Sequence, residues 1–207
     1  MIISPYEQGT DEWLLDRAPV VTTSCFSNAT SKGRGKAPSK TKLDYMKEKA
    51  NAIITQKLPV GGYKNAAMQR GNDLEPEARE YYSMLKSASV EQSGLIYLNE
   101  LKRIGASVDG LVGDDGLVEI KCPNLNTHID YLTDGVMPST YIKQVQGQMW
   151  VTGRKWCDFI SYHPDAFKMA FVIRVARDEE YIKELSNGIY AFIGELDVMV
   201  EKFRSML

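Results

Sequence analysis

The chain has 207 residues, with 25 Lys or Arg against 27 Asp or Glu, so its formal net charge of −2 gives no overall cationic surplus for binding a polyanion. Its three cysteines are far apart and odd in number, which excludes a disulfide framework and a cysteine-based zinc or iron–sulfur site. The sequence shows neither a signal peptide nor an apolar segment of membrane-spanning length, so it predicts one cytoplasmic domain over residues 1–207.

The N-terminal part of the chain predicts a short helix, a basic loop and a second helix. Thr10 is placed to cap a helix that stops before Pro19. Residues 31–42 are rich in Gly, Pro and Ser and lack acidic side chains, so they predict a basic loop, for which a solvated connection is the simplest interpretation. Thr41 then caps a helix of about residues 42–56. The cations of the loop are Lys32, Arg34, Lys36, Lys40 and Lys42.

The remaining elements are helices and strands in a mixed order. Helices are expected at about residues 65–87, 140–151 and 179–203. Strands are expected at about residues 94–98, 104–112, 116–122, 156–162 and 169–175. The segment after the third strand is expected to be a loop, because it contains Gly135 and Pro138, and Ser139 is expected to cap the next helix. This order predicts an α/β (α+β) domain with a central mixed β-sheet flanked by helices.

Two of these strands form a hairpin that gathers charged side chains. A turn at residues 113–116 separates them. Because side chains alternate along a strand, Glu119 and Lys121 share one face while Ile120 points into the core. If the hairpin places Asp109 beside Glu119, two carboxylates and an ammonium share one small volume, and the carboxylates repel unless a cation lies between them. A hard divalent ion such as Mg²⁺ suits oxygen ligands of this kind.

The same residues also have a plain structural interpretation. Glu119 and Lys121 would form a solvent-exposed salt bridge across the strand, which contributes little to stability. A second match to the acid-x-lysine pattern, at residues 100–102, lies in a polar stretch that resembles a turn and is set aside. Histidine-based chemistry has few candidates, because the chain contains only His128 and His163.

Several motifs that follow one another along the chain are more specific than the hairpin alone. They are EQGTDEW at 7–13 with Arg17 and residues 22–24 behind it, GNDLEPEAR at 71–79, SVDGL at 107–111, LVEIKCP at 117–123, and YIKQVQ with MWVT at 141–152. In this order they resemble the lambda-type 5′ to 3′ exonucleases of phage recombination systems, also called YqaJ-like viral recombinases, within the PD-(D/E)XK nuclease superfamily. The resemblance spans most of the chain and implies a restriction-endonuclease-like fold.

The resemblance implies an activity and a metal site. The activity is a metal-dependent 5′ to 3′ exonuclease that digests one strand of linear double-stranded DNA from 5′-phosphorylated ends and leaves 3′ single-stranded tails. Asp109 and Glu119 would bind one or two Mg²⁺ ions with the carbonyl of Ile120, and Mn²⁺ would substitute. Glu75 would complete the site. Lys121 would orient the attacking water and compensate negative charge on the phosphate.

A pocket for the 5′ phosphate is also implied by the resemblance. Arg17, Ser24 and Ser107 would form it together with Gln144, which shares one face of its expected helix with Gln148. A guanidinium with hydroxyl donors suits a terminal phosphate. The plain alternatives are a surface salt bridge for Arg17 and helix capping or strand-end hydrogen bonds for the serines.

Contacts with DNA and with other proteins follow from the same resemblance. Met68 corresponds to an apolar position that would wedge apart the terminal base pairs, and core packing is the alternative. The five cations of the basic loop would contact backbone phosphates, with an affinity that falls with salt. The resemblance further implies a homotrimeric ring, a single-strand annealing protein as partner, and a phage or prophage origin with action in the bacterial cytoplasm.

Two other functions keep part of this pattern. A PD-(D/E)XK endonuclease or junction resolvase would share the metal site and lack the pocket for the strand end. A non-catalytic DNA-binding subunit would keep the fold, but decayed nucleases usually lose at least one of the four residues Glu75, Asp109, Glu119 and Lys121, all of which this chain retains. An iron–sulfur nuclease is excluded, because the cysteine cluster that it needs is absent.

Overall fold

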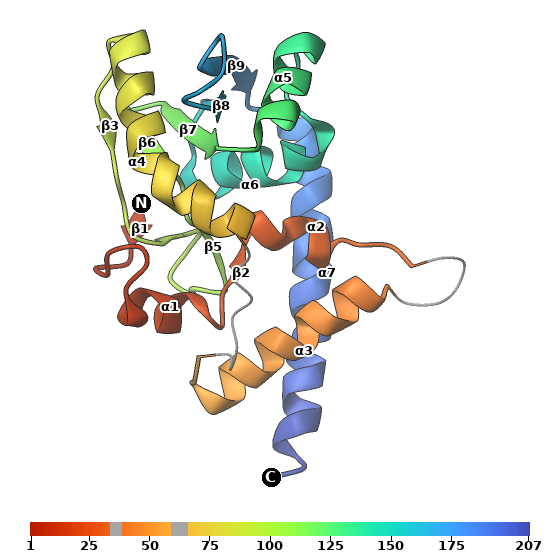
Figure 1. The fold of residues 1–207 in the computed structure, drawn as a ribbon. Helices are drawn as coiled ribbons and strands as arrows, with labels where there is room; N and C mark the ends of the chain where they lie inside the picture. Colours follow the sequence, from red (N-terminus) through yellow and green to blue (C-terminus); the bar gives the residue numbers. More distant parts are fainter. Residues whose placement is uncertain (34–38, 59–65) are drawn as a thin grey trace.

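Two mixed β-sheets with helices packed around them form the fold of the computed structural model, which describes residues 1–33, 39–58 and 66–207 (Figure 1). The four-stranded sheet has the order β1 (Ile2–Ile3), β4 (Ile96–Tyr97), β5 (Ile104–Ala106) and β2 (Val21–Thr22). The five-stranded sheet has the order β3 (Val90–Glu91), β6 (Gly110–Val112), β7 (Gly116–Lys121), β8 (Trp156–Tyr162) and β9 (Ala170–Ala176). Each sheet contains one parallel pair, β2 with β5 and β7 with β8.

The described helices surround these sheets. They are α1 (Asp11–Arg17), α2 (Phe26–Ala29), α3 (Lys40–Thr55), α4 (Ala66–Lys86), α5 (Leu125–Asp134), α6 (Ile142–Thr152) and α7 (Glu179–Arg204), with short 3₁₀ turns η1 (Thr23–Cys25) and η2 (Ser139–Tyr141). The predicted fold class is therefore confirmed, and the expected helix at about 179–203 is α7. No described helix is long and apolar enough to cross a bilayer.

One strand prediction needs correction, because the strands form two mixed sheets and not one continuous sheet. The apolar run 104–112, expected as one strand, is divided between β5 in the four-stranded sheet and β6 in the five-stranded sheet. The chain crosses from one sheet to the other at residues 107–109. Asp109 therefore lies at the junction of the two sheets, immediately before β6.

Three helix predictions also need correction. Ser39, not Thr41, caps α3, because its hydroxyl accepts a hydrogen bond from the backbone N–H of Lys42 at 3.3 Å. Lys40 and Lys42 therefore belong to α3 rather than to a loop. Ser139 makes no capping hydrogen bond with its side chain and begins the 3₁₀ turn η2 that precedes α6.

The expected loop after β7 contains a helix, α5. Asn124 caps it, since its side chain accepts a hydrogen bond from the N–H of Thr127 at 2.9 Å. Gly135 ends it with a left-handed backbone (φ 67°), a conformation that glycine adopts without steric cost. The helix α5 begins a few residues after Lys121, so it follows directly from the charged end of β7.

The strand β7 is covered on both faces. Val118 and Ile120 pack with Ala78 and Tyr82 of α4, whereas Leu117 packs in the larger core that includes residues of α6 and α7. Figure 1 shows α4 crossing one side of the five-stranded sheet. The predicted alternation is confirmed, because Ile120 lies in the core beneath α4. The opposite face, which carries Glu119, is turned toward α6.

Replacing Gly110 by Ala is expected to lower the free energy of unfolding by about 1–3 kcal/mol, the usual cost of overpacking a core. An added Cβ would lie 2.1 Å from Cγ1 of Val90 and 3.0 Å from Cγ1 of Val118, and both valines are stiff β-branched side chains. Because Gly110 directly follows Asp109, the close approach of these strands also fixes where that carboxylate lies. Urea unfolding followed by circular dichroism measures the change.

Gly194→Ala is the control for this prediction. Gly194 lies in α7, and an added Cβ would meet nothing within 4 Å. Alanine favours helix over glycine by about 0.5–1 kcal/mol, so this variant is expected to be more stable than the wild type. Equal stability of the Gly110 variant and the wild type would contradict the described packing of β3 on β6.

Candidate active site

The hairpin of β6 and β7 places Asp109 beside Glu119. Gly110 pairs with Val118 in the register of this hairpin, so the next residues outward, Asp109 and Glu119, are neighbours. The carboxylate of Asp109 accepts a hydrogen bond from the backbone N–H of Ile120 at 2.6 Å. Glu119 has no exposed surface, so the interpretation as a solvent-exposed salt bridge is wrong.

Both carboxylate oxygens of Glu119 are bound by donors. The ammonium of Lys121 and the amide of Gln144 donate to Oε1, the latter at 2.6 Å. The amide of Gln148 donates to Oε2 at 2.5 Å. Gln144 and Gln148 lie one turn apart on α6 and reach Glu119 from the same side. Their shared helix face, visible in the sequence, is thus turned toward the acidic pair.

Glu75 approaches the same place from α4. It accepts a hydrogen bond from Nη2 of Arg79, one turn further along the helix, and Nε of Arg79 donates to the backbone carbonyl of Asp109 at 2.9 Å. Arg79 therefore ties Glu75 to the start of β6. The predicted catalytic residues Glu75, Asp109, Glu119 and Lys121 are brought together, and this cluster is called the acidic site below.

The pKa shifts in the acidic site come first from burial and then from the neighbouring charges. Burial, together with the charges of Glu119 and Glu75, raises the pKa of the Asp109 carboxyl well above its ordinary value. Burial also raises the pKa of Glu75, against the attraction of Arg79. Burial lowers the pKa of the Lys121 ammonium, but the carboxylates of Glu119 and Asp109 outweigh this and raise it. A cation among these carboxylates would relieve their repulsion.

The donor set of the acidic site fits a small divalent cation. Asp109 and Glu119 offer carboxylate oxygens, and the expected third ligand is the carbonyl of Ile120. Within residues 1–33, 39–58 and 66–207, no group of three or more His, Cys, Asp or Glu side chains is arranged to hold a metal by itself. Mg²⁺ does not need one, because it usually keeps several waters and takes only one or two carboxylates. Glu75, paired with Arg79, remains a predicted ligand.

Arg17 and Ser24 form a second group of predicted site residues. Nη2 of Arg17 donates to the hydroxyls of Thr22 and Ser24, both at 3.2 Å. In the described part of the chain Arg17 makes no ion pair, so the predicted alternative of a surface salt bridge is not found. The contact of Thr22 with Arg17 was not predicted, although Thr22 lies in the motif at residues 22–24.

The other two residues of the predicted phosphate pocket lie nearer to the acidic site. Gln144 donates to Glu119, and the carbonyl of Ser107 accepts from Gln148 at 3.4 Å. The hydroxyl oxygen of Ser107 is buried without a hydrogen-bond partner in the described residues. Gly147 allows the elements near Arg17 and Ser24 to lie against the helix α6 that carries Gln144. A Cβ at Gly147 would lie 2.7 Å from the ring of Phe26, so its absence lets α2 and η1 pack against α6.

The residues predicted to contact DNA are only partly described. Lys32 is exposed. Lys40 forms an ion pair with Asp44 at 2.5 Å, and Lys42 forms one with Glu195 at 2.7 Å. Arg34, Lys36 and the side chain of Met68 lie outside the described residues.

Comparison with known proteins decides the family. The model of the YqaJ-like viral recombinase domain matches residues 12–155, well over half of the chain. The protein belongs to this family. The matched residues run from α1 to the residue before β8, so they include the Arg17 group and every residue of the acidic site.

Solved structures resemble this YqaJ-like chain over almost its whole length. An alkaline exonuclease (LHK-Exo) from Laribacter hongkongensis is 39% identical, with a TM-score of 0.85, over 95% of this chain and 97% of that one. Its complex with dAMP has a TM-score of 0.86 at the same identity and coverage. A phage related exonuclease from Haemophilus somnus 129PT shares the fold at 17% identity, with a TM-score of 0.68, over 89% of this chain and 96% of that one.

A curated relative is much longer than this YqaJ-like chain. Uncharacterized protein R354 of Acanthamoeba polyphaga mimivirus is 28% identical over 179 residues, which is 80% of this chain. The chain spans 31% of the length of that relative. The likeness therefore concerns one part of the mimivirus protein.

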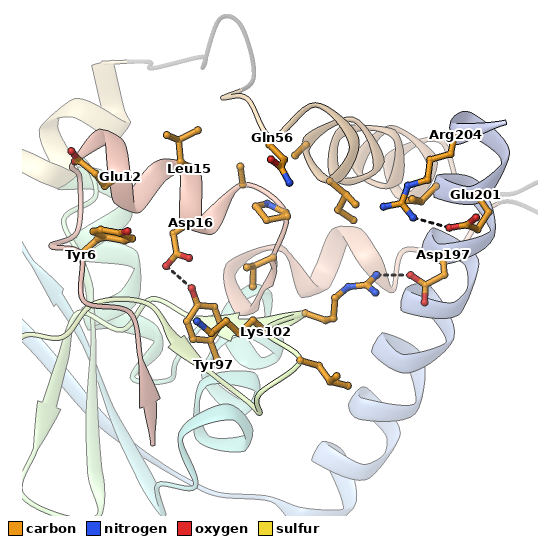
Figure 2. A pocket seen from close by; sticks show the side chains of 18 residues that line it. Tyr6, Glu12, Leu15, Asp16, Gln56, Tyr97, Lys102, Asp197, Glu201 and Arg204 are labelled. Carbon is orange, nitrogen blue, oxygen red and sulfur yellow. Dashed lines mark hydrogen bonds and ion pairs between the residues drawn. The ribbon is translucent and has the colours of Figure 1, made fainter. Parts of the chain in front are cut away.

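The YqaJ-like domain also has a hollow of about 840 Å³ between α1, α3, α7 and the β4–β5 turn (Figure 2). Its lining includes neither the acidic site nor Arg17. Five of its charged side chains pair with one another or with a hydroxyl: Arg103 with Asp197 at 2.6 Å, Arg204 with Glu201 at 2.8 Å, and Asp16 with Tyr97. Most of its charged groups are thus engaged with other residues of the protein.

Proposed function

We propose that the protein is a metal-dependent exonuclease that digests one strand of linear double-stranded DNA from 5′-phosphorylated ends, in the 5′ to 3′ direction, and leaves 3′ tails for phage-type recombination. The observation that carries the proposal is the acidic site itself, in which Asp109 and the fully buried Glu119 lie beside Lys121. The likeness to an alkaline exonuclease over 95% of the chain supports the same reaction class.

Hydrolysis of a phosphodiester needs an activated water, neutralised charge on the phosphoryl group and a stabilised leaving oxygen. Asp109, Glu119 and the carbonyl of Ile120 would hold Mg²⁺, or Mn²⁺ in its place, as one or two ions. The chemistry that such an ion supplies is polarisation of the phosphate and a lower pKa of water. Lys121 keeps its proton because of the neighbouring carboxylates, so it would orient the attacking water and compensate charge on the phosphate.

The Arg17 group would select the strand end. The hydroxyls of Thr22 and Ser24 hold the guanidinium of Arg17 in place, and hydroxyls and guanidinium together would donate to a terminal phosphate. The side-chain amide of Gln144 donates a hydrogen bond to Glu119 in this structure. To join the phosphate pocket, Gln144 would release Glu119 and donate to the substrate phosphate instead.

Contacts beyond the strand end remain part of the proposal. Lys32, Arg34 and Lys36 would contact backbone phosphates, whereas Lys40 and Lys42 would first have to leave their ion pairs with Asp44 and Glu195. Met68 would wedge the terminal base pairs. A homotrimeric ring, a single-strand annealing protein as partner and action in the bacterial cytoplasm are proposed from the family resemblance.

Linear and circular DNA distinguish the candidate functions. Linear duplex is expected to be digested only when Mg²⁺ or Mn²⁺ is present, and closed circular plasmid is expected to stay intact, because it offers no strand end to the Arg17 group. Gel analysis over time, with chelator as the control, measures both. Cleavage of the closed circle would instead indicate an endonuclease or resolvase. Binding of DNA without cleavage of either substrate, with either metal, would indicate a non-catalytic subunit.

A further inference from the structure

Gln148 is a fully buried polar side chain on the core side of α6. Its amide nitrogen donates to Oε2 of Glu119 at 2.5 Å and approaches the carbonyl of Ser107 at 3.4 Å. Its own side-chain oxygen is buried and has no hydrogen-bond partner among the described residues. The NH₂ group of this amide is therefore hydrogen-bonded to the acidic site, whereas its oxygen has no described partner.

Packing does not account for glutamine at this position. The neighbouring residues Val145 and Met149 of α6 are buried in the hydrophobic core. Methionine is similar to glutamine in length and shape and would fill the same space without leaving a buried oxygen unpaired, which is unfavourable. The interaction that a methionine could not replace is the hydrogen bond to Glu119.

The two glutamines on Glu119 differ in what they can do. Gln144 is half-buried and shares Oε1 with the ammonium of Lys121, so the oxygen keeps a donor if Gln144 leaves. Gln148 has no exposed surface and is the single described donor on Oε2. One oxygen of Glu119 thus has exchangeable partners, and the other has a fixed one.

We propose that Gln148 is a positioning residue, which holds the carboxylate of Glu119 in the orientation needed to bind the divalent cation while Gln144 exchanges between Glu119 and the substrate. This inference rests on the proposed nuclease function and adds a residue to its site. Hydrogen-bond partners of metal-binding side chains commonly contribute about 10–100-fold to metal affinity or activity. A contribution of this size is expected from Gln148.

Gln148→Met tests the inference. Calorimetric titration with Mn²⁺ in the absence of DNA is expected to show metal affinity reduced by about 10–100-fold. Digestion of linear duplex at saturating metal is expected to show a lower kcat with an unchanged KM, because Gln148 is buried and out of reach of DNA. Gln148→Asn, which keeps an amide but shortens the side chain by one methylene, is expected to give the same losses and serves if the methionine variant is unstable.

Gln146→Met is the matched control. Gln146 lies on the same helix and is equally buried, but its amide bonds to the carbonyl of Ala176 at 2.9 Å and to the N–H of Asp178 at 3.0 Å, so it ties α6 to the end of β9. This variant is expected to lower the thermal unfolding temperature and to leave Mn²⁺ affinity and kcat unchanged. A purely structural role for Gln148 predicts the same result for both variants.

The outcomes separate the inference from the proposed function. Wild-type metal affinity and kcat in the Gln148 variants would overturn the inference, as would losses that merely parallel a lower unfolding temperature. Failure of the wild type to bind Mn²⁺ would overturn it too. If the wild type binds Mn²⁺ but does not digest DNA, the proposed function fails, and the affinities of the Gln148 variants still decide whether Gln148 positions Glu119.

Discussion

Asp109→Asn is expected to reduce the digestion of linear duplex DNA by at least about 10²–10³-fold, the usual loss when one group that stabilises transition-state charge is removed. Asparagine has nearly the same shape as aspartate and keeps an oxygen that can accept the hydrogen bond from the N–H of Ile120, which is 2.6 Å long in the wild type. The hairpin is therefore expected to fold as before. The substitution removes one negative charge where the cation is expected to bind. Release of acid-soluble nucleotides from linear duplex measures the rate.

Glu119→Gln is expected to cause a loss of similar size but is a less clean test. The carboxylate of Glu119 accepts hydrogen bonds from Lys121, Gln144 and Gln148, and the new NH₂ group would have to face one of these donors. Part of any loss would therefore come from rearrangement of the site. Asp109→Asn, with a single described donor on its carboxylate, separates charge from shape better.

Asp158→Asn is the matched control for Asp109→Asn. Asp158 is a buried acid on the neighbouring strand β8, where Tyr82 and Arg174 donate to it. Its replacement is expected to lower stability while activity at a permissive temperature is kept. Gel-shift binding of duplex DNA is expected to be similar for both variants and the wild type. Turnover of Asp109→Asn within tenfold of the wild type would contradict the assignment of the acidic site.

Three residues of the acidic site, Asp109, Glu119 and Lys121, could be predicted from the sequence because their geometry is local, whereas Glu75 comes from the distant helix α4 and was implied only by the family resemblance. A short turn and two apolar runs define a hairpin, and the alternation of side chains places Glu119 and Lys121 on one face of β7. The approach of Asp109 follows from the register of the same hairpin. No distant part of the chain is needed for these three residues to meet.

The contacts that the sequence did not predict depend on distant partners. The apolar run 104–112 gives no sign that its first half pairs with β2 and β4 and its second half with β3 and β7. Periodicity places Gln148 on a helix face, but only the packing of α6 on β7 brings that face to Glu119. The helix α5 was missed because Gly135 and Pro138 indicated a loop, although Asn124 and Gly135 are recognisable end signals of a helix.

Arg17→Ala is expected to slow the digestion of 5′-phosphorylated ends by about 10–100-fold and to change the digestion of 5′-hydroxyl ends much less. A hydrogen bond to a charged group contributes about 1.5–3 kcal/mol, and each 1.4 kcal/mol corresponds to a factor of about ten. The guanidinium donates hydrogen bonds to the hydroxyls of Thr22 and Ser24, both at 3.2 Å. The substitution therefore removes the only cation of this group. Initial rates on duplexes that differ only in the 5′ end measure the ratio.

Two further variants make the test of Arg17 specific. Arg17→Lys keeps the charge but loses the planar pair of donors, so it is expected to recover part of the preference for phosphate. Arg204→Ala removes an exposed arginine of α7 that pairs with Glu201, and it is expected to leave both rates unchanged. The phosphate pocket predicts an effect that depends on the end group. If Arg17→Ala slows both kinds of end equally, Arg17 supports the fold of α1 or general DNA binding, and the pocket must lie elsewhere.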